Sequence, residues 1–207
     1  MNSVPPSSPL ESPFEELIDG LLNQGFGLSD QLFTPSLLTG LRENLMRYHQ
    51  AGEMYSAGVG RKFDYQHNAE VRGDVIRWIE ADSEDPHEQA FHLRIADFVH
   101  YLNRTCYTSI NAYEFHYACY EPGSFFKRHL DQFRRDRGRK FSFVMYLNED
   151  WQPQDGGQLV LYLEPGAEEV LPLGGRTIFF KSDEVEHEVK PAPERVRIGI
   201  AGWLKSW

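Results

Sequence analysis

Apolar residues recur every three or four positions in three segments of the first half of the chain, residues 13–25, 34–52 and 85–105. This is the period of an amphipathic helix. The second segment opens with a Thr-Pro pair and the third with an Asp-Pro pair, and each pair suits an N-cap followed by proline at the first helical position. Glycine ends the first two segments. We therefore predict three helices over these ranges.

The second half shows a different period, because apolar and polar residues alternate one by one. Alternation of this kind is typical of a strand with one face in a core. In the clearest example, His116 and Tyr120 share a face opposite Phe115 and Cys119. The predicted strands are residues 75–80, 111–123, 140–151, 156–166, 169–182, 186–191 and 195–203.

Short strands separated by Gly/Pro turns favour a sandwich or a barrel. We expect a mainly β fold with flanking α-helices, a small antiparallel barrel with the helices packed on one side. Residues 1–12 are rich in Pro and Ser and are predicted to be a disordered lead-in. The rest, 13–207, is predicted to be a single domain, with helical support in 13–105 and the β core in 106–207. The long unpatterned loop of residues 52–70 has the character of a functional lid.

Composition narrows the classes of partner. The net charge of −10 argues against general affinity for nucleic acids or anionic membranes. The sequence contains no apolar run long enough to span a bilayer and no secretory signal pattern at its start. The two cysteines, Cys106 and Cys119, indicate reduced thiols rather than a disulfide framework, so we expect a cytoplasmic protein. A local basic stretch, residues 134–140, is the exception, and it could steer or contact a substrate.

Two polar residues beside this basic stretch carry the first chemical signal. His129 and Asp131 are two positions apart, and on extended backbone such residues point the same way. His187, near the start of a later strand, supplies a third candidate ligand. Two histidines and one carboxylate on one face of an ion form the facial triad of non-haem Fe(II) oxygenases. By spacing alone, a surface histidine at 187 is an equally good interpretation.

An arginine close behind the second histidine extends the pattern. A 2-oxo acid that chelates the metal leaves its far carboxylate in need of a cation, and the planar guanidinium binds a carboxylate in a bidentate manner. Arg195 and Arg197 have the same strand parity, and periodicity does not choose between them. Gly199, of the same parity, would leave room beside a ligand. Tyr146 faces inward by alternation and could share the carboxylate.

Several segments together resemble a known family. The chain looks like the prolyl 4-hydroxylases that sense oxygen in animals, and more like the bacterial prolyl hydroxylase domain proteins related to them. The resemblance runs from about residue 71 to the C-terminus, in the same order and at similar spacing. The segments are VRGDVIRWIE, ACYEPGSFFKRHLDQF, YLNEDW, GGQL, FFKSDEVEHEVKP and RVRIGIAGW.

The resemblance implies a double-stranded β-helix, or jelly-roll, with Fe(II) held by His129, Asp131 and His187. The cosubstrates it implies are 2-oxoglutarate and O2. Sequence alone does not identify the metal, and a zinc-dependent jelly-roll enzyme is a weaker alternative.

The resemblance also assigns the cosubstrate pocket. It implies that Arg197 binds 2-oxoglutarate, because this arginine keeps the family's spacing to Trp203. Tyr146 and Tyr120 match tyrosines that contact 2-oxoglutarate in the family. His116 shares the face of Tyr120, so we expect it to line the pocket without binding the metal.

The substrate side follows from the same resemblance. Asp74 matches a residue that helps to hold the substrate-covering loop, which makes residues 52–70 the expected lid. Arg139, from the basic stretch, is expected to serve the lid or the substrate. Phe126 departs from the animal enzymes, which carry tyrosine at this position, so no role of that hydroxyl transfers to this chain.

The function implied is 4-hydroxylation of a prolyl residue, with 2-oxoglutarate converted to succinate and CO2. For the bacterial relatives, the resemblance suggests a proline in a switch loop of elongation factor Tu as the target. One alternative is a related oxygenase that acts on a small molecule or a free amino acid. The other is a non-catalytic sensor that binds 2-oxoglutarate and a partner protein.

Overall fold

The computed structural model describes residues 11–58, 71–132 and 138–207. Within these residues the chain forms three α-helices, one short 3-10 helix and two antiparallel β-sheets. No helix among them combines the length and apolar character needed to cross a membrane. The predicted lid of residues 52–70 and the basic stretch of residues 134–140 fall largely outside the described part of the chain.

The helices begin and end at the signals in the sequence. The Thr34 hydroxyl accepts a hydrogen bond from the Leu37 N–H, and the Asp85 carboxylate accepts from two N–H groups of the first helical turn. Gly25 ends the first helix with φ 86°, a conformation that favours glycine. The helices are α1 (Ser12–Gln24), α2 (Pro35–Gln50) and α3 (Pro86–Cys106).

The larger sheet contains seven strands and gathers both halves of the chain. All its neighbouring strands are antiparallel, and the first-half strands pair with second-half ones at both ends. In sheet order the strands are β1 (Phe26–Ser29), β9 (Thr177–Lys181), β6 (Arg139–Tyr146), β11 (Arg197–Lys205), β4 (Ala112–Tyr120), β3 (Asp74–Ile79) and β2 (Tyr55–Ser56).

The smaller sheet contains four strands and faces the larger one. Its order is β5 (Phe126–His129), β10 (Glu186–Val189), β7 (Leu159–Tyr162) and β8 (Ala167–Val170). The 3-10 helix η1 (Pro153–Asp155) precedes β7. Two facing antiparallel sheets of this kind form a jelly-roll, so the predicted fold class is confirmed.

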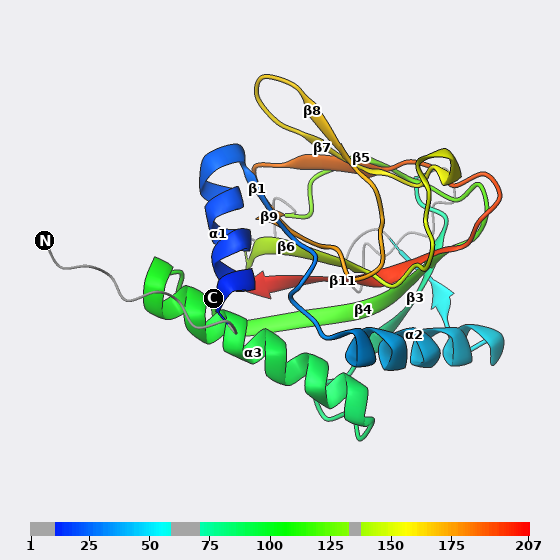
Figure 1. Cartoon of the computed structure of the whole chain (residues 1–207), viewed down its shortest axis with the longest axis horizontal. Coiled ribbons are helices and arrows are strands. Elements are labelled where there is room, and N and C mark those ends of the chain that lie inside the picture. The colour runs from blue at the N-terminus through cyan, green and yellow to red at the C-terminus, as the bar shows by residue number, and fades with distance from the viewer. Residues whose placement is uncertain (1–10, 59–70, 133–137) are drawn as a thin grey trace, which may run out of the picture.

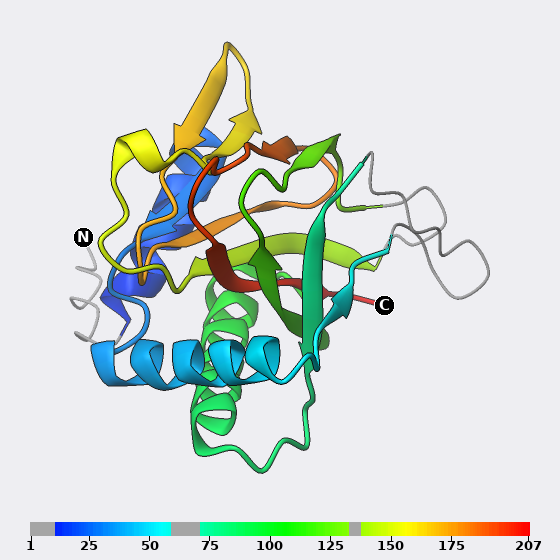
Figure 2. The same cartoon turned by 90° about the vertical axis from the view of Figure 1, so that its right-hand side faces the viewer.

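The layers are seen in Figures 1 and 2, where α2 and α3 lie beneath the larger sheet and the smaller sheet lies above it. Two hydrophobic clusters correspond to these two interfaces. One joins the helices to the larger sheet and contains Phe98, Phe115 and Phe143. The other lies between the sheets and contains Tyr120 and Tyr146. The helices therefore support one face of the larger sheet and leave its other face for the space between the sheets.

Four strands, β1, β2, β5 and β8, are not identified by the hydrophobic pattern, and β2 lies in the predicted lid. β1 follows α1 directly and pairs with β9, and β8 forms a hairpin with β7. β5 has the sequence FKRH with no buried residue, so it shows no alternation to detect. The prediction of one strand over residues 169–182 is wrong, because a turn at residues 174–175 separates the end of β8 in the smaller sheet from β9 in the larger one. The other predicted strands are present, with ends that differ from the predicted ones by up to five residues.

Candidate functional site

Two histidines face each other across neighbouring strands of the smaller sheet. β5 and β10 pair antiparallel, with His129 directly opposite His187. Their ring centroids are 4.3 Å apart. Asp131 follows β5, and its two carboxylate oxygens lie 3.5 Å from Nε2 of His129 and 3.5 Å from Nε2 of His187. The three predicted ligands therefore converge on one point.

Hydrogen bonds orient both imidazoles toward that point. Nδ1 of His129 donates to the Lys127 carbonyl oxygen at 2.7 Å, and Nδ1 of His187 donates to the Val185 carbonyl oxygen at 3.2 Å. Because a carbonyl oxygen only accepts, each ring carries its proton on Nδ1 and turns the Nε2 lone pair inward. Burial also lowers the pKa of His187 to about 4. This histidine is therefore neutral at pH 7, as metal binding requires.

A hydrogen bond from a buried serine fixes the position of the Asp131 carboxylate. The Ser142 hydroxyl donates to Oδ2 at 2.7 Å, and Ser142 lies 2.9 Å from the hydroxyl of Ser182. Burial alone would raise the pKa of Asp131, but His187, His129 and the Ser142 hydrogen bond together lower it. Asp131 is therefore ionised, as a carboxylate metal ligand must be.

The donor chemistry of this group fits a divalent metal. One ligand atom from each of His129, Asp131 and His187 lies within 4.8 Å of the other two. The side chains of His129 and Asp131 are 19% and 12% exposed, so the point of convergence is largely shielded from water. Two imidazoles and one carboxylate on one face leave the opposite face open, which suits Fe(II) in a non-haem oxygenase.

Arg197 lies in the same cavity, on the larger sheet. It is 4% exposed, and its Nη2 donates to the Tyr146 hydroxyl at 3.3 Å. Its guanidinium carbon is 4.9 Å from the ring centre of Tyr120 and 4.8 Å from that of Tyr146. Among the described residues it has no carboxylate partner, and its buried Nε has no hydrogen-bond partner.

A buried cation without a counter-charge is unfavourable unless an anion joins it. Arg197 therefore fits a ligand carboxylate, such as the far carboxylate of 2-oxoglutarate. Burial raises the pKa of both Tyr146 and Tyr120. Both phenols therefore keep their protons at neutral pH and can donate to the same carboxylate.

One cavity of about 180 Å³ contains both the metal ligands and the arginine. His116, Trp203 and Trp78 form an aromatic wall, with centroid distances of 5.0 to 6.5 Å. Nδ1 of His116 and Nε1 of Trp203 are buried without a partner in the described residues. Burial, with a smaller contribution from the Arg72 charge, lowers the pKa of His116 to about 4. His116 is thus neutral, and it lies outside the cluster of metal-ligating side chains.

Arg139 also lines the cavity. It donates to Glu114 Oε1 at 3.1 Å and to the Asp131 carbonyl oxygen at 3.3 Å. Its guanidinium carbon lies 3.4 Å from the ring centre of Trp203. Arg139 therefore braces the aromatic wall and the backbone of a candidate metal ligand.

Asp74 is the one predicted site residue that does not line the cavity. It is 2% exposed and accepts two hydrogen bonds from Arg72, at 2.7 and 2.5 Å. Arg72 does line the cavity, and its guanidinium carbon lies 4.4 Å from the ring centre of Phe126. Phe126 in turn stacks on His129 with centroids 3.5 Å apart. Asp74 thus contacts the site through Arg72 and Phe126.

The structure distinguishes the two candidate arginines. Arg195 lies in a bend before β11 and donates to Asp155 Oδ2 at 2.6 Å, outside the cavity. Sequence reasoning missed Arg72, Trp78 and Ser142. The sequence contained a signal for two of them. Ser142 lies on the same predicted strand face as Tyr146, and Trp78 lies within the predicted strand of residues 75–80.

Comparison with known proteins gives a consistent set of relatives. The model of the 2OG-Fe(II) oxygenase superfamily matches residues 115–205. Human Egl nine homolog 1 is 27% identical over 210 residues, which cover 96% of this chain and 48% of that protein. The chain thus spans about half the length of the curated relatives it matches.

Solved structures extend the similarity over nearly the whole chain. A prolyl-4-hydroxylase from Pseudomonas putida is 32% identical with a TM-score of 0.83, and the match covers 94% of this chain and 99% of that one. A prolyl hydroxylase from Trichoplax adhaerens, solved with a peptide of the hypoxia inducible factor oxygen degradation domain, is 27% identical with a TM-score of 0.86. That match covers 95% of this chain and 90% of the other.

Proposed function

The chain belongs to the prolyl 4-hydroxylase family within the 2OG-Fe(II) oxygenase superfamily, and on that premise we propose that it hydroxylates a prolyl residue of a protein. Enzymes of the superfamily use Fe(II), 2-oxoglutarate and O2. The observation that carries the proposal is one cavity holding His129, Asp131 and His187 together with the uncompensated cation of Arg197.

The candidate ligands have separate tasks. His129, Asp131 and His187 hold the Fe(II), and the backbone carbonyls and Ser142 keep their donor atoms turned toward it. Bound Fe(II), with 2-oxoglutarate and O2, supplies the oxidising power needed to hydroxylate a C–H bond, and 2-oxoglutarate becomes succinate and CO2.

The remaining residues of the cavity bind 2-oxoglutarate and exclude water. Arg197 and the Tyr146 hydroxyl bind the far carboxylate of 2-oxoglutarate, and Tyr120 closes the same end of the cavity. Trp203, His116 and Trp78 line the other part and exclude water from it. A dry, shaped cavity protects the reaction from side reactions with solvent.

A protein substrate is supported by the Trichoplax relative, which was solved with a peptide of the hypoxia inducible factor. The resemblance to bacterial prolyl hydroxylase domain proteins makes elongation factor Tu the first candidate. The target residue would then be a proline in one of its switch loops.

The test is intact and peptide mass spectrometry of elongation factor Tu after incubation with the enzyme, Fe(II), 2-oxoglutarate and air. The expected result is one added oxygen atom on a proline. His129→Ala should abolish it, whereas His100→Ala, an exposed histidine on α3, should not. Succinate without oxygen on elongation factor Tu would reject this substrate and keep the oxygenase. No succinate above the His129→Ala background would reject the enzymatic proposal and favour a non-catalytic sensor.

A further inference from the structure

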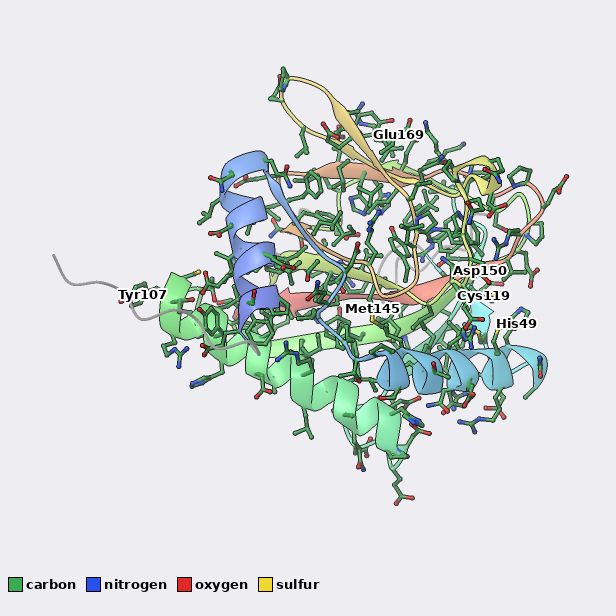
Figure 3. All side chains as sticks on the ribbon, viewed as in Figure 1. His49, Tyr107, Cys119, Met145, Asp150 and Glu169 are labelled. Atoms are coloured by element: carbon green, nitrogen blue, oxygen red, sulfur yellow. The ribbon has the colours of Figure 1, made fainter. Side chains whose placement is uncertain are left out.

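A second group of metal-ligating side chains lies outside the cavity. His49 is in the last turn of α2, Cys119 is on β4, and Glu121 directly follows β4. One ligand atom from each lies within 4.8 Å of the other two. Figure 3 places the labelled His49 and Cys119 close together at the same end of the molecule, beside the end of α2. Two elements far apart in the sequence thus bring three different donors to one point.

This group is separated from the cavity by the larger sheet itself. Cys119 belongs to the hydrophobic cluster on the helix side of β4, whereas its neighbour Tyr120 faces the space between the sheets. Nothing in the proposed hydroxylation uses His49, Cys119 or Glu121.

The donors combine burial with access. Cys119 is fully buried and is a free cysteine. Nε2 of His49 donates to Glu121 Oε1 at 2.7 Å, and these side chains are 28% and 51% exposed. The buried thiol of Cys119 can therefore supply one metal ligand from the protein interior. The side chains of His49 and Glu121 are accessible to a cation from solvent.

We propose that His49, Cys119 and Glu121 bind a second metal ion, a borderline-soft divalent cation of the Zn²⁺ type. A thiolate selects against Mg²⁺ and Ca²⁺, which prefer oxygen ligands, and sulfur with imidazole suits Zn²⁺. Three protein ligands leave the fourth tetrahedral position to water. The bound cation would tie the end of α2 to β4, next to Tyr120 of the cosubstrate pocket.

The geometry requires only a small adjustment. Metal–ligand bonds of about 2.0–2.3 Å place tetrahedral donors roughly 3.3–3.8 Å apart. All three donor atoms already lie within 4.8 Å of one another, and His49 Nε2 and Glu121 Oε1, now 2.7 Å apart, must separate by about 0.6 Å to bind one ion. Glu121, half exposed and beyond the end of β4, is free to move by that amount.

Metal binding at this site releases one proton, from the Cys119 thiol. Burial raises the pKa of the Cys119 thiol to about 12, so it is protonated until a cation arrives. Binding forms a metal–sulfur bond and releases the thiol proton to solvent. The imidazole of His49 keeps one proton by moving it from Nε2 to Nδ1.

The test is a titration of the metal-free protein with Co²⁺, followed by absorption spectroscopy. Cobalt bound to a thiolate shows a sulfur-to-metal charge-transfer band, whereas nitrogen and oxygen ligands give none. Wild type should bind two equivalents and show the band. Cys119→Ser should lose the band and one equivalent, and Cys106→Ser, an exposed thiol at the end of α3, should keep both. His129→Ala should keep the band and lose the other equivalent, so the two sites fail independently.

Two further variants test the same site if Cys119→Ser does not fold. His49→Gln and Glu121→Gln are partly exposed changes, and each should weaken the affinity of the thiolate-containing site for Co²⁺ at least tenfold. Wild type that binds a single equivalent without the band would overturn the proposal. A band that survives both exposed changes at unaltered affinity would overturn it as well.

Discussion

The two faces of β4 differ in how their polar groups are satisfied. On the helix face, Tyr117 is fully buried and its hydroxyl donates to Glu88 of α3 at 3.1 Å. On the cavity face, Nδ1 of His116 has no partner among the described residues, and neither does Nε of Arg197 on the neighbouring strand. Buried polar groups are normally bonded. The cavity face therefore keeps bonding capacity for 2-oxoglutarate and substrate, whereas the Tyr117 hydroxyl on the helix face has already used its own.

The helix face is instead dominated by aromatic contacts. Phe98 has ring centroids 5.1 Å from Phe14 and 5.2 Å from Phe179, and Phe115 lies 5.4 Å from Phe143. Such contacts contribute to stability and make no demand on a ligand. The comparison predicts that loss of an aromatic contact on the helix face alters the free energy of unfolding, whereas loss of Arg197 on the cavity side alters the affinity for 2-oxoglutarate.

The largest effect is expected on the helix face. Phe98→Ala removes a fully buried ring and should lower the free energy of unfolding by about 3–5 kcal/mol. Urea denaturation measures this, and titration below the transition should find an unchanged affinity for 2-oxoglutarate. Leu93→Ala, on the same helix but 68% exposed, is the matched control and should change stability by less than about 0.5 kcal/mol. A stable Phe98→Ala protein with weakened ligand binding would contradict the comparison.

The next effect is expected on the cavity face. Arg197→Ala removes the cation that we propose binds the 2-oxoglutarate carboxylate, and it should cost about 2–5 kcal/mol of binding free energy, at least about 30-fold in affinity. Stability should hold or rise, because the variant no longer buries an uncompensated charge.

Calorimetric titration with 2-oxoglutarate in the presence of a redox-inert divalent metal measures the loss. Arg195→Ala is the matched control two residues away, since Arg195 binds Asp155 outside the cavity. If Arg195→Ala weakened binding and Arg197→Ala did not, the assignment of the carboxylate site would be wrong.

The sequence alone predicts which residues of β4 lie on each of its faces, because side chains two positions apart on a strand point to the same side. The same argument put Tyr146 and His116 inward correctly. It failed to choose between Arg195 and Arg197, since the backbone bends before β11 and parity does not hold across a bend. The opposition of His129 and His187 was also inaccessible, because the register of β5 and β10 depends on turns elsewhere in the sheet.

Gly199 shows a different limit of sequence reasoning. Its predicted role was to leave room for a ligand, and it does line the cavity. However, a Cβ at this position would lie 2.6 Å from the Met145 carbonyl oxygen of the paired strand β6. The close approach of two strands therefore explains this glycine, and only the three-dimensional pairing reveals it.

The smallest expected effect is a pH dependence of the free energy of unfolding. It tests the cavity face of β4, through His116, in the absence of any ligand. An unfolded histidine takes up its proton near pH 6.5, whereas buried His116 does so near pH 4. Between these values the unfolded state binds more protons, so the free energy of unfolding falls as the pH is lowered. The shift of about 2.5 pKa units corresponds to about 3 kcal/mol by pH 4.

Denaturation of the metal-free protein at pH 7, 6 and 5 measures this contribution as the difference between wild type and His116→Asn. The difference should narrow steadily on acidification, because only wild type loses the His116 contribution. His100→Asn, an exposed histidine on α3, should follow wild type at each pH. Parallel curves for wild type and His116→Asn would mean that His116 is already solvated or protonated in the folded state. The cavity face would then lack the unsatisfied nitrogen that distinguishes it from the helix face.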